Sequence, residues 1–135
     1  MPVRIAIGPR DIEQGTVEVA RRDTKEKSVY QLTDLDVKIE HLLSQIQENI
    51  YNKALNFREE NTYHADSWEE FTDIIENKTG FVYAHWDGTP ETEQAIKEKT
   101  KATIRCIPLN NKLEDGKCIL TGNASVQRVL FARAY

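Results

Sequence analysis

The chain has 135 residues and a mass of 15.6 kDa, a size that allows one domain or two small units around a real hydrophobic core. Hydrophobic residues make up 39% and charged residues 30% of it, which excludes fibrous and disordered proteins. Residues 34–98 carry a net charge of −10 while residues 1–33 and 99–135 carry +1 and +5, so the whole chain is not a basic nucleic-acid-binding protein and only its two ends tolerate a polyanion.

The first 33 residues predict a meander of three strands. Apolar and polar residues alternate over 3–7, 16–22 and 29–32, and turn residues fill the intervals 8–11 and 23–26. Three short strands cannot bury both faces of a sheet, unless the next helix covers them. We therefore expect this segment to be the end of a larger sheet, and the chain to be a fragment of a longer protein.

Two helices are predicted next. Thr33 is a candidate N-cap with Asp36 three residues later, and apolar residues recur at helical spacing as far as Phe57. A helix over 34–60 would be roughly 40 Å long, which suits a connector between two domains. Residues 61–64 are expected to break it. Ser67 then favours the start of a second helix, which closes at residues 77–80.

The remainder predicts alternating strands and one helix, and no internal repeat is present. Strands are expected over 81–86, 102–107, 117–120 and 127–134, a loop over 108–116, a turn over 122–125, and a helix over 91–99 with Thr89 as its N-cap. In the last strand Val129, Phe131 and Tyr135 share one face, while the other face is also apolar. This pattern predicts a central, buried strand. Apolar runs of about four residues are far shorter than the roughly 20 that a membrane-spanning helix needs.

Few side chains have a pattern typical of chemistry. Cys106 and Cys118 are too few for a disulfide framework and predict reduced thiols in a cytoplasmic protein, mostly buried. They lack two of the four ligands of a structural zinc, which only His64 and His85 are near enough in sequence to supply. His85 is instead expected to be a hydrogen-bonded core histidine. Carboxylate pairs at helix ends, and the absence of any phosphate-binding loop, favour a non-catalytic module.

Two groups of basic residues remain, and both have a plain interpretation as solvated charges. Arg10, Arg21 and Arg22 form the first group. Strand alternation places Arg21 and Arg22 on opposite faces, so at most one of them joins Arg10. The second group surrounds the last strands and comprises Lys99, Lys101, Arg105, Arg128 and Arg133. Planar guanidinium groups suit phosphates and base edges.

Two stretches of the sequence resemble one known family over essentially the whole chain. The first comprises PVRIAIGPRD at residues 2–11 and VARRDT at residues 19–24; the second comprises FVYAHWDG at 81–88, KTKATIRCIP at 99–108, GKC at 116–118 and RVLFARAY at 128–135. The first is similar to the end of the anticodon-binding domain of prolyl-tRNA synthetases, and the second to the C-terminal domain of their archaeal and eukaryotic-like type. The resemblance implies an α+β protein with three parts: strands over 1–33 that end an α/β anticodon-binding domain, a connecting helix over 34–61, and a two-layer C-terminal domain over 62–135.

The same resemblance implies a function. The parent would be a class II ligase of the cytoplasm that uses ATP and Mg²⁺ to attach proline to tRNA(Pro), and would be a homodimer. This chain lacks the upstream catalytic domain, so we expect it to be inactive alone, to contribute tRNA contacts through Arg10, Arg21 and Arg22, and to pack on the catalytic domain. The carboxylate of Tyr135 would lie near the parent active site. A free-standing tRNA- or protein-binding module is the alternative.

The resemblance also bears on zinc. Zinc-bearing relatives use four cysteines, one of them shortly after the position of Cys118, where this chain continues with ILTG. Cys106 likewise lacks its partner in the following loop. We therefore expect no metal, and packing and turns in its place.

Overall fold

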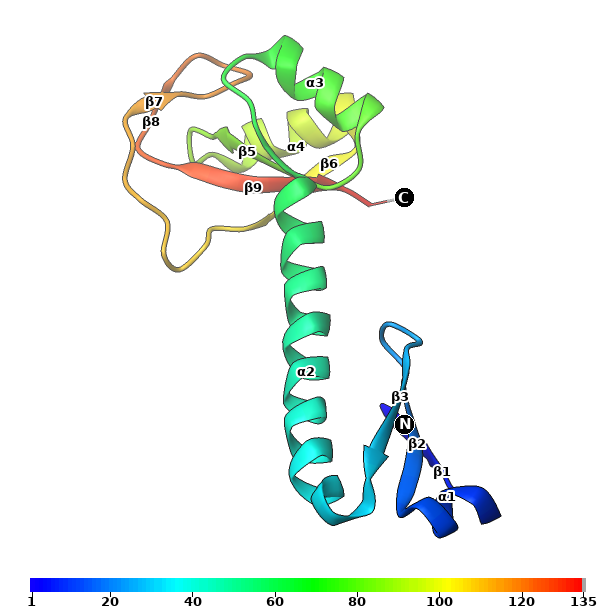
Figure 1. Cartoon of the computed structure of the whole chain (residues 1–135). Helices are drawn as coiled ribbons and strands as arrows, with labels where there is room; N and C mark the ends of the chain where they lie inside the picture. The colour runs from blue at the N-terminus through cyan, green and yellow to red at the C-terminus, as the bar shows by residue number, and fades with distance from the viewer. Residues whose placement is uncertain (135) are drawn as a thin grey trace. The chain divides into compact units, whose positions relative to one another are not determined.

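The computed structural model describes residues 1–134, which form two compact units, one over residues 1–56 and one from residue 57 onward (Figure 1). Each unit has its own hydrophobic core and contains both helix and strand, so the predicted α+β class is confirmed. Over the described residues, no helix is both long and apolar enough to cross a membrane.

Unit 1, residues 1–56, contains a three-stranded antiparallel sheet, one short helix and most of one long helix. The strands β1 (Val3–Ala6), β2 (Thr16–Arg21) and β3 (Lys27–Gln31) lie in the order β1-β2-β3. A 3₁₀ turn, Leu32–Asp34, leads into α2 (Leu35–Glu60), which is continuous over 26 residues. Leu42 and Ile46 of α2 pack on Val17 and Val19 of β2, and all four are at most 5% exposed. One face of the predicted meander is therefore covered by the helix that follows it.

Two local predictions in unit 1 are wrong. Residues 8–11, expected to be a turn, begin the short helix α1 (Pro9–Gln14), because Pro9 suits the first helical position and the Asp11 carboxylate accepts a hydrogen bond of 2.8 Å from the Gly8 N–H. Thr33, expected to cap the long helix, lies inside the 3₁₀ turn instead. The backbone of that turn already provides the first helical bonds, so a side-chain cap is not needed.

Unit 2 is a four-stranded sheet with two helices on one face. Its elements are β4 (Thr62–His64), α3 (Trp68–Asn77), β5 (Phe81–His85), α4 (Pro90–Thr100), β6 (Ala102–Cys106), the short β7 (Gly116–Lys117) and β8 (Ala124–Ser125), and β9 (Arg128–Arg133). The strand order is β4-β5-β9-β6, and α3 and α4 lie together over the sheet (Figure 1). Phe71 of α3 meets Phe131 of β9 edge to face at 5.1 Å, and both are fully buried.

The predicted central position of the last strand is confirmed. β9 pairs with β5 on one side and β6 on the other, both antiparallel. Val129 and Phe131 are 0% exposed and Ala132, on the opposite face, is 6% exposed. Tyr135, which was expected to share the face of Phe131, lies outside the described residues.

The helix starts in unit 2 are confirmed, whereas several short connections differ from prediction. Ser67 accepts a hydrogen bond of 3.2 Å from the Glu70 N–H, and Thr89 accepts one of 3.3 Å from the Thr92 N–H. Residues 62–64, predicted to be a break, form β4 in parallel with β5. Of the strand predicted over 117–120 only Lys117 is in a strand, the two-residue β7, and part of the predicted turn over 122–125 pairs with it as β8. Each of these short strands forms because a partner segment lies beside it, and not because of the residue pattern of the strand itself.

Gly80 allows β4 and β5 to meet. Its φ is +136°, and a Cβ at this position would collide with the carbonyl oxygen of Asn61, which accepts a 2.8 Å hydrogen bond from the Phe81 N–H.

We expect Gly80→Ala to lower the free energy of unfolding of unit 2 by about 1–3 kcal/mol more than Gly122→Ala does. Gly122 is the matched control, because it also has a positive φ, +73°, but has nothing within 4 Å of an added Cβ. Urea unfolding followed by tryptophan fluorescence reports on unit 2 alone, since both tryptophans, Trp68 and Trp86, lie there. Equal losses in the two variants would show that the close approach to Asn61 costs nothing.

Candidate functional site

The three arginines predicted to contact RNA in unit 1 are not brought together. Arg10 is exposed on α1, which precedes β2, whereas Arg21 is the last residue of β2 and pairs with Val3. Because a strand rises about 3.3 Å per residue, the length of β2 separates Arg10 from the other two. The structure thus offers two separate basic positions rather than one cluster.

Arg21 is committed to a structural ion pair. Its guanidinium donates two hydrogen bonds, of 2.8 and 2.6 Å, to the Asp23 carboxylate, and Asn49 of α2 donates a third to the same carboxylate at 2.7 Å. The bonds from Arg21 hold the pKa of Asp23 well below its usual range. Arg21 therefore fixes the β2–β3 connection to α2, while the neighbouring Arg22 is exposed.

The two cysteines do not form a metal site with their surroundings. Cys106 is exposed on β6 and Cys118 is buried, and both are free thiols, so the predicted burial holds for Cys118 alone. Among residues 1–134, no three His, Cys, Asp or Glu side chains are grouped to hold a metal ion. His85, as predicted, is buried at 4% exposure, with its Nδ1 3.0 Å from the Ser125 Oγ. The side chains present therefore do not fit a tetrahedral zinc.

A polar cluster in unit 2 is centred on Arg128. The Arg128 guanidinium donates to both oxygens of Glu114 at 3.0 and 3.1 Å, and to Asp66 at 2.5 Å. The bonds from Arg128 lower the pKa of Glu114. The loop over 107–127 is thereby attached to the start of β9 and to the segment before α3. The sequence indicated Arg128 only as one of several cations, because its partners are 14 and 62 residues away.

Gly116 lies next to this cluster, at a position where a side chain would not fit. The His85 ring lies directly against it, so an added Cβ would overlap the imidazole. Gly116 pairs with Ser125, the hydrogen-bond partner of His85, which places β7 and β8 against the end of β5.

Asp87 holds a second polar cluster, at the turn between β5 and α4. Its carboxylate accepts hydrogen bonds from the side chains of Thr89, Thr92, Thr121 and Asn123 at 2.8–3.3 Å. Partial burial alone would raise its pKa, but the threonine hydroxyls outweigh that effect and lower the pKa from 3.8 to about 2. This cluster ties the start of α4 to the turn that follows Cys118.

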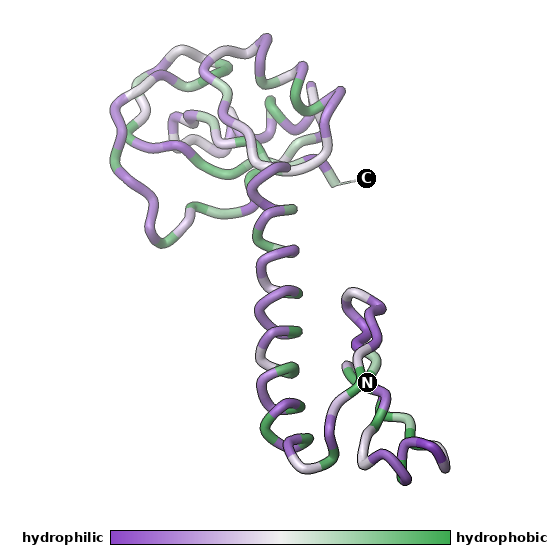
Figure 2. Tube along the Cα trace, in the orientation of Figure 1, coloured by the Kyte–Doolittle hydropathy of each residue, from purple (hydrophilic) through white to green (hydrophobic). Residues whose placement is uncertain are grey.

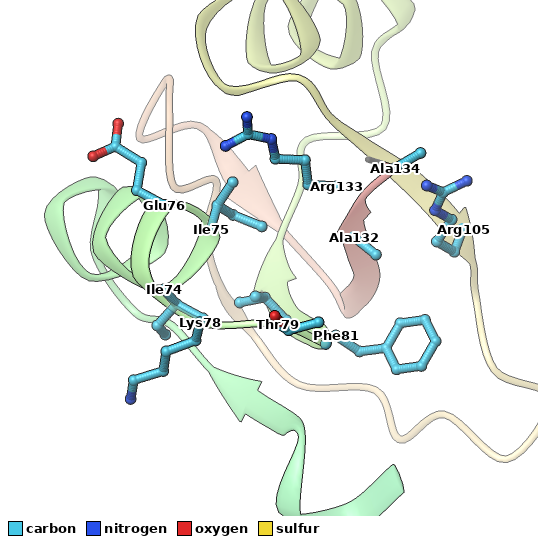
Figure 3. Close-up of a pocket in the computed structure, with 12 residues that line it drawn as sticks. Ile74, Ile75, Glu76, Lys78, Thr79, Phe81, Arg105, Ala132, Arg133 and Ala134 are labelled. Carbon is cyan, nitrogen blue, oxygen red and sulfur yellow. The ribbon is translucent and has the colours of Figure 1, made fainter.

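A cavity in unit 2 lies where β9 ends. It has a volume of about 750 Å³ and a mainly apolar lining. We call it the sheet-end pocket and define it by Lys78, Phe81, Arg105, Ala132, Arg133 and Ala134 (Figure 3). Arg105 occurs at a bulge, because the pairing of β6 with β9 shifts between Ile104 and Cys106. A bulge of this kind re-aims a side chain. The pocket was not anticipated from the sequence, although two of its cations were noted there.

Comparisons with known proteins match two family models to different parts of the chain. Residues 68–135 match the family model described as "Prolyl-tRNA synthetase, C-terminal", and residues 1–49 match the "Anticodon binding domain" model. Over 135 residues, the chain is 60% identical to a "Proline--tRNA ligase" of Cytophaga hutchinsonii and 56% identical to those of Porphyromonas gingivalis and Flavobacterium psychrophilum. All of this chain is covered in each comparison, but the chain spans only 27–28% of the length of these relatives.

The Asp87 cluster makes a testable contribution to stability. A carboxylate with a lowered pKa stabilises the folded state above its unfolded pKa, near 3.9, and loses that contribution as the pH falls toward about 2. We expect Asp87→Asn to lower the free energy of unfolding by about 1–2 kcal/mol at pH 7 and to approach the wild type between pH 4 and pH 2.

Asp115→Asn is the control for this prediction, because it removes the same charge from an exposed loop position. Thermal unfolding of both variants and the wild type across this pH range provides the measurement. A constant difference between wild type and Asp87→Asn at all pH values would contradict the assignment.

Proposed function

The chain belongs to the prolyl-tRNA synthetase family, and from this premise we propose that it is the C-terminal part of an ATP-dependent class II ligase that attaches proline to tRNA(Pro). One observation carries the proposal. Along the chain, the anticodon-binding family model matches residues 1–49 and the prolyl-tRNA synthetase C-terminal model matches residues 68–135. Curated relatives are at least 50% identical to this chain across all 135 residues.

The parts of the chain would then have different tasks. Residues 1–33 would form the end of the anticodon-binding domain, and residues 62–135 would form the domain that packs on the catalytic domain. Residues 34–61 would be the helix that connects these two parts. ATP and Mg²⁺ would bind to the catalytic domain of a parent that is a homodimer. Tyr135, through its terminal carboxylate, would accept hydrogen bonds near that active site.

The tRNA contacts in unit 1 would come from Arg10 and Arg22, the two exposed arginines of the predicted group. Arg22 follows β2, and its backbone N–H donates to the Pro2 carbonyl at 2.9 Å, so its position is fixed while its side chain stays exposed. Arg10 is exposed on α1. Arg21, bound to Asp23, would support Arg22 by holding the connection in place rather than by touching RNA.

The zinc site of zinc-bearing relatives would be replaced by the Arg128 cluster. The bidentate pair with Glu114 and the bond to Asp66 attach the same loop to the sheet.

Activity of the chain alone tests the proposed division of labour. We expect the purified 135-residue chain to show no proline-dependent pyrophosphate exchange, because its residues include no ATP-binding motif, while the full-length synthetase carrying it is active. The assay compares both proteins at equal molarity with proline and ATP. Exchange by the 135-residue chain would refute the proposal, and a full-length protein that is inactive with tRNA(Pro) would favour a binding module instead.

Arginine substitutions test the tRNA contacts. In the full-length enzyme, Arg10→Ala and Arg22→Ala should each raise the KM for tRNA about ten- to a hundredfold, the loss expected for one charge-assisted hydrogen bond. The effect should shrink at high salt if the contacts are to phosphate. Arg4→Ala is the control, since Arg4 is an exposed cation of the same sheet, 3.9 Å from Glu18. An unchanged KM in both variants would remove these residues from the site.

A further inference from the structure

The exposed apolar side chains of unit 2 gather in one segment. Over residues 57–134, every large hydrophobic side chain that is exposed, except Phe57 at the end of α2, lies within residues 107–126: Ile107, Leu109, Leu113 and Val126. We call these four residues the loop patch. Leu109 is fully exposed and Leu113 is 81% exposed. Single exposed apolar residues are ordinary on a protein surface, but a group of them confined to one segment marks an interaction site.

The loop that carries the patch is held in one conformation by hydrogen bonds to the start of β9 and the residues before it. The Asn111 side chain donates to the Arg128 carbonyl at 2.6 Å, and the Glu114 carboxylate accepts from the Arg128 guanidinium at 3.0 Å. The Glu114 N–H also donates to the Val126 carbonyl at 2.9 Å. Because Leu113 directly precedes Glu114, this last bond brings two members of the loop patch together. The patch is therefore preorganised, and its side chains are exposed although the backbone that carries them is fixed.

The two helices of unit 2 show the opposite distribution. In α3 the apolar residues are buried, and its exposed residues are Glu69, Glu70, Asp73, Glu76 and Asn77. In α4 every exposed residue except Pro90 is polar or charged. Outer helix faces of this kind are well solvated and need no partner. The loop patch is thus the part of unit 2 whose exposure to water is unfavourable.

We propose that the loop patch docks on an apolar surface of the remainder of the same polypeptide. This choice of partner rests on the proposed function, in which the chain is one part of a longer synthetase. The chain spans only 27–28% of the length of its relatives, so more than two thirds of such a protein lies outside it. All four members of the patch are aliphatic, and they therefore offer RNA neither a cation nor an aromatic ring.

The size of the loop patch favours an attached partner over a second copy of the chain. A stable interface between free proteins uses roughly 20–30 residues on each side, far more than this patch provides. A partner in the same polypeptide is present at an effective concentration of about millimolar, so a small contact is sufficient. The loop is also ordered by its own hydrogen bonds, so docking costs little additional conformational entropy.

The reactivity of a cysteine placed in the patch tests the proposal. Val126→Cys is the reporter, in a Cys106→Ser background that removes the exposed native thiol, and Cys118 is buried. A maleimide should modify the reporter about tenfold more slowly in the full-length synthetase than in the 135-residue chain, because a covered thiol reacts only when the contact opens. Lys97→Cys, at an exposed position of α4, is the matched control and should react equally fast in both proteins.

Two pairs of substitutions show whether the leucines make the contact. Leu109→Ser/Leu113→Ser should restore the fast reaction of the Val126→Cys reporter in the full-length protein. Asn110→Ser/Lys112→Ser, at exposed polar positions of the same loop, should leave that reaction slow. In the 135-residue chain neither pair should change the midpoint of urea unfolding followed by tryptophan fluorescence, since all four side chains are exposed.

Several outcomes would overturn the proposal. Equal reporter rates in the two proteins would do so, as would a slow rate that persists in the full-length Leu109→Ser/Leu113→Ser variant. Slowing of Lys97→Cys by the same factor would show general cover of unit 2 instead of docking through the patch. A reporter rate that falls as the 135-residue chain is concentrated would identify a second copy as the occupant, and protection of that chain by added tRNA would identify a nucleic acid.

The measurement is distinguishable from the test of the proposed function, because it uses neither ATP nor proline. A protected reporter in a full-length protein without ligase activity would refute the proposed function and support the docking. A reactive reporter in an active ligase would refute the docking alone.

Discussion

Unit 2 depends on the insertion of β9 between β5 and β6. This strand comes from the last residues of the chain and pairs with segments that end more than 20 residues earlier. Val129 and Phe131 are completely buried under α3 and α4, so the hydrophobic core is unfinished until this strand is in place. Such non-local pairing is entropically costly, and burial of large apolar side chains is the main contribution that offsets it.

Two features of unit 2 lie at the two ends of this strand. At its start, Arg128 attaches the long loop through Glu114 and Asp66. At its end, Arg133 lines the sheet-end pocket, where the bulge in β6 also directs Arg105 (Figure 3). A charged side chain is thus used structurally at one end of β9 and left available at the other.

The apolar residues of α2 and of α3 are distributed differently along their helices. In α2, apolar and polar residues alternate along the helix (Figure 2), and of its apolar residues only Leu42 and Ile46 are buried. In α3 the apolar residues form one face, and Phe71, Ile74 and Ile75 are all buried. Unit 1 correspondingly has the smaller core, and the ion pair between Arg21 and Asp23, joined to α2 by Asn49, supplements it.

Local patterns in the sequence determined most of the elements. The helix caps at Ser67 and Thr89 were predictable, and so were the long helix and the main strands. Each depends on residues that lie close together in the sequence. The family, too, followed from contiguous motifs, as the comparisons confirm. The burial of His85 and the central position of β9 were also predictable, because both lie in apolar stretches that are typical of a protein interior.

Tertiary structure alone decided what depends on distant partners. β4 is a strand only because Gly80 lets β5 approach Asn61, and Arg128 is a structural residue only because Glu114 and Asp66 are folded against it. The sequence grouped Arg10 with Arg21 and Arg22, yet the length of β2 separates Arg10 from the other two. Lys78, Arg105 and Arg133 looked unrelated, yet they line one cavity. A charge acts over a few ångströms, and distances between residues far apart in a chain are set by packing, which no local pattern contains.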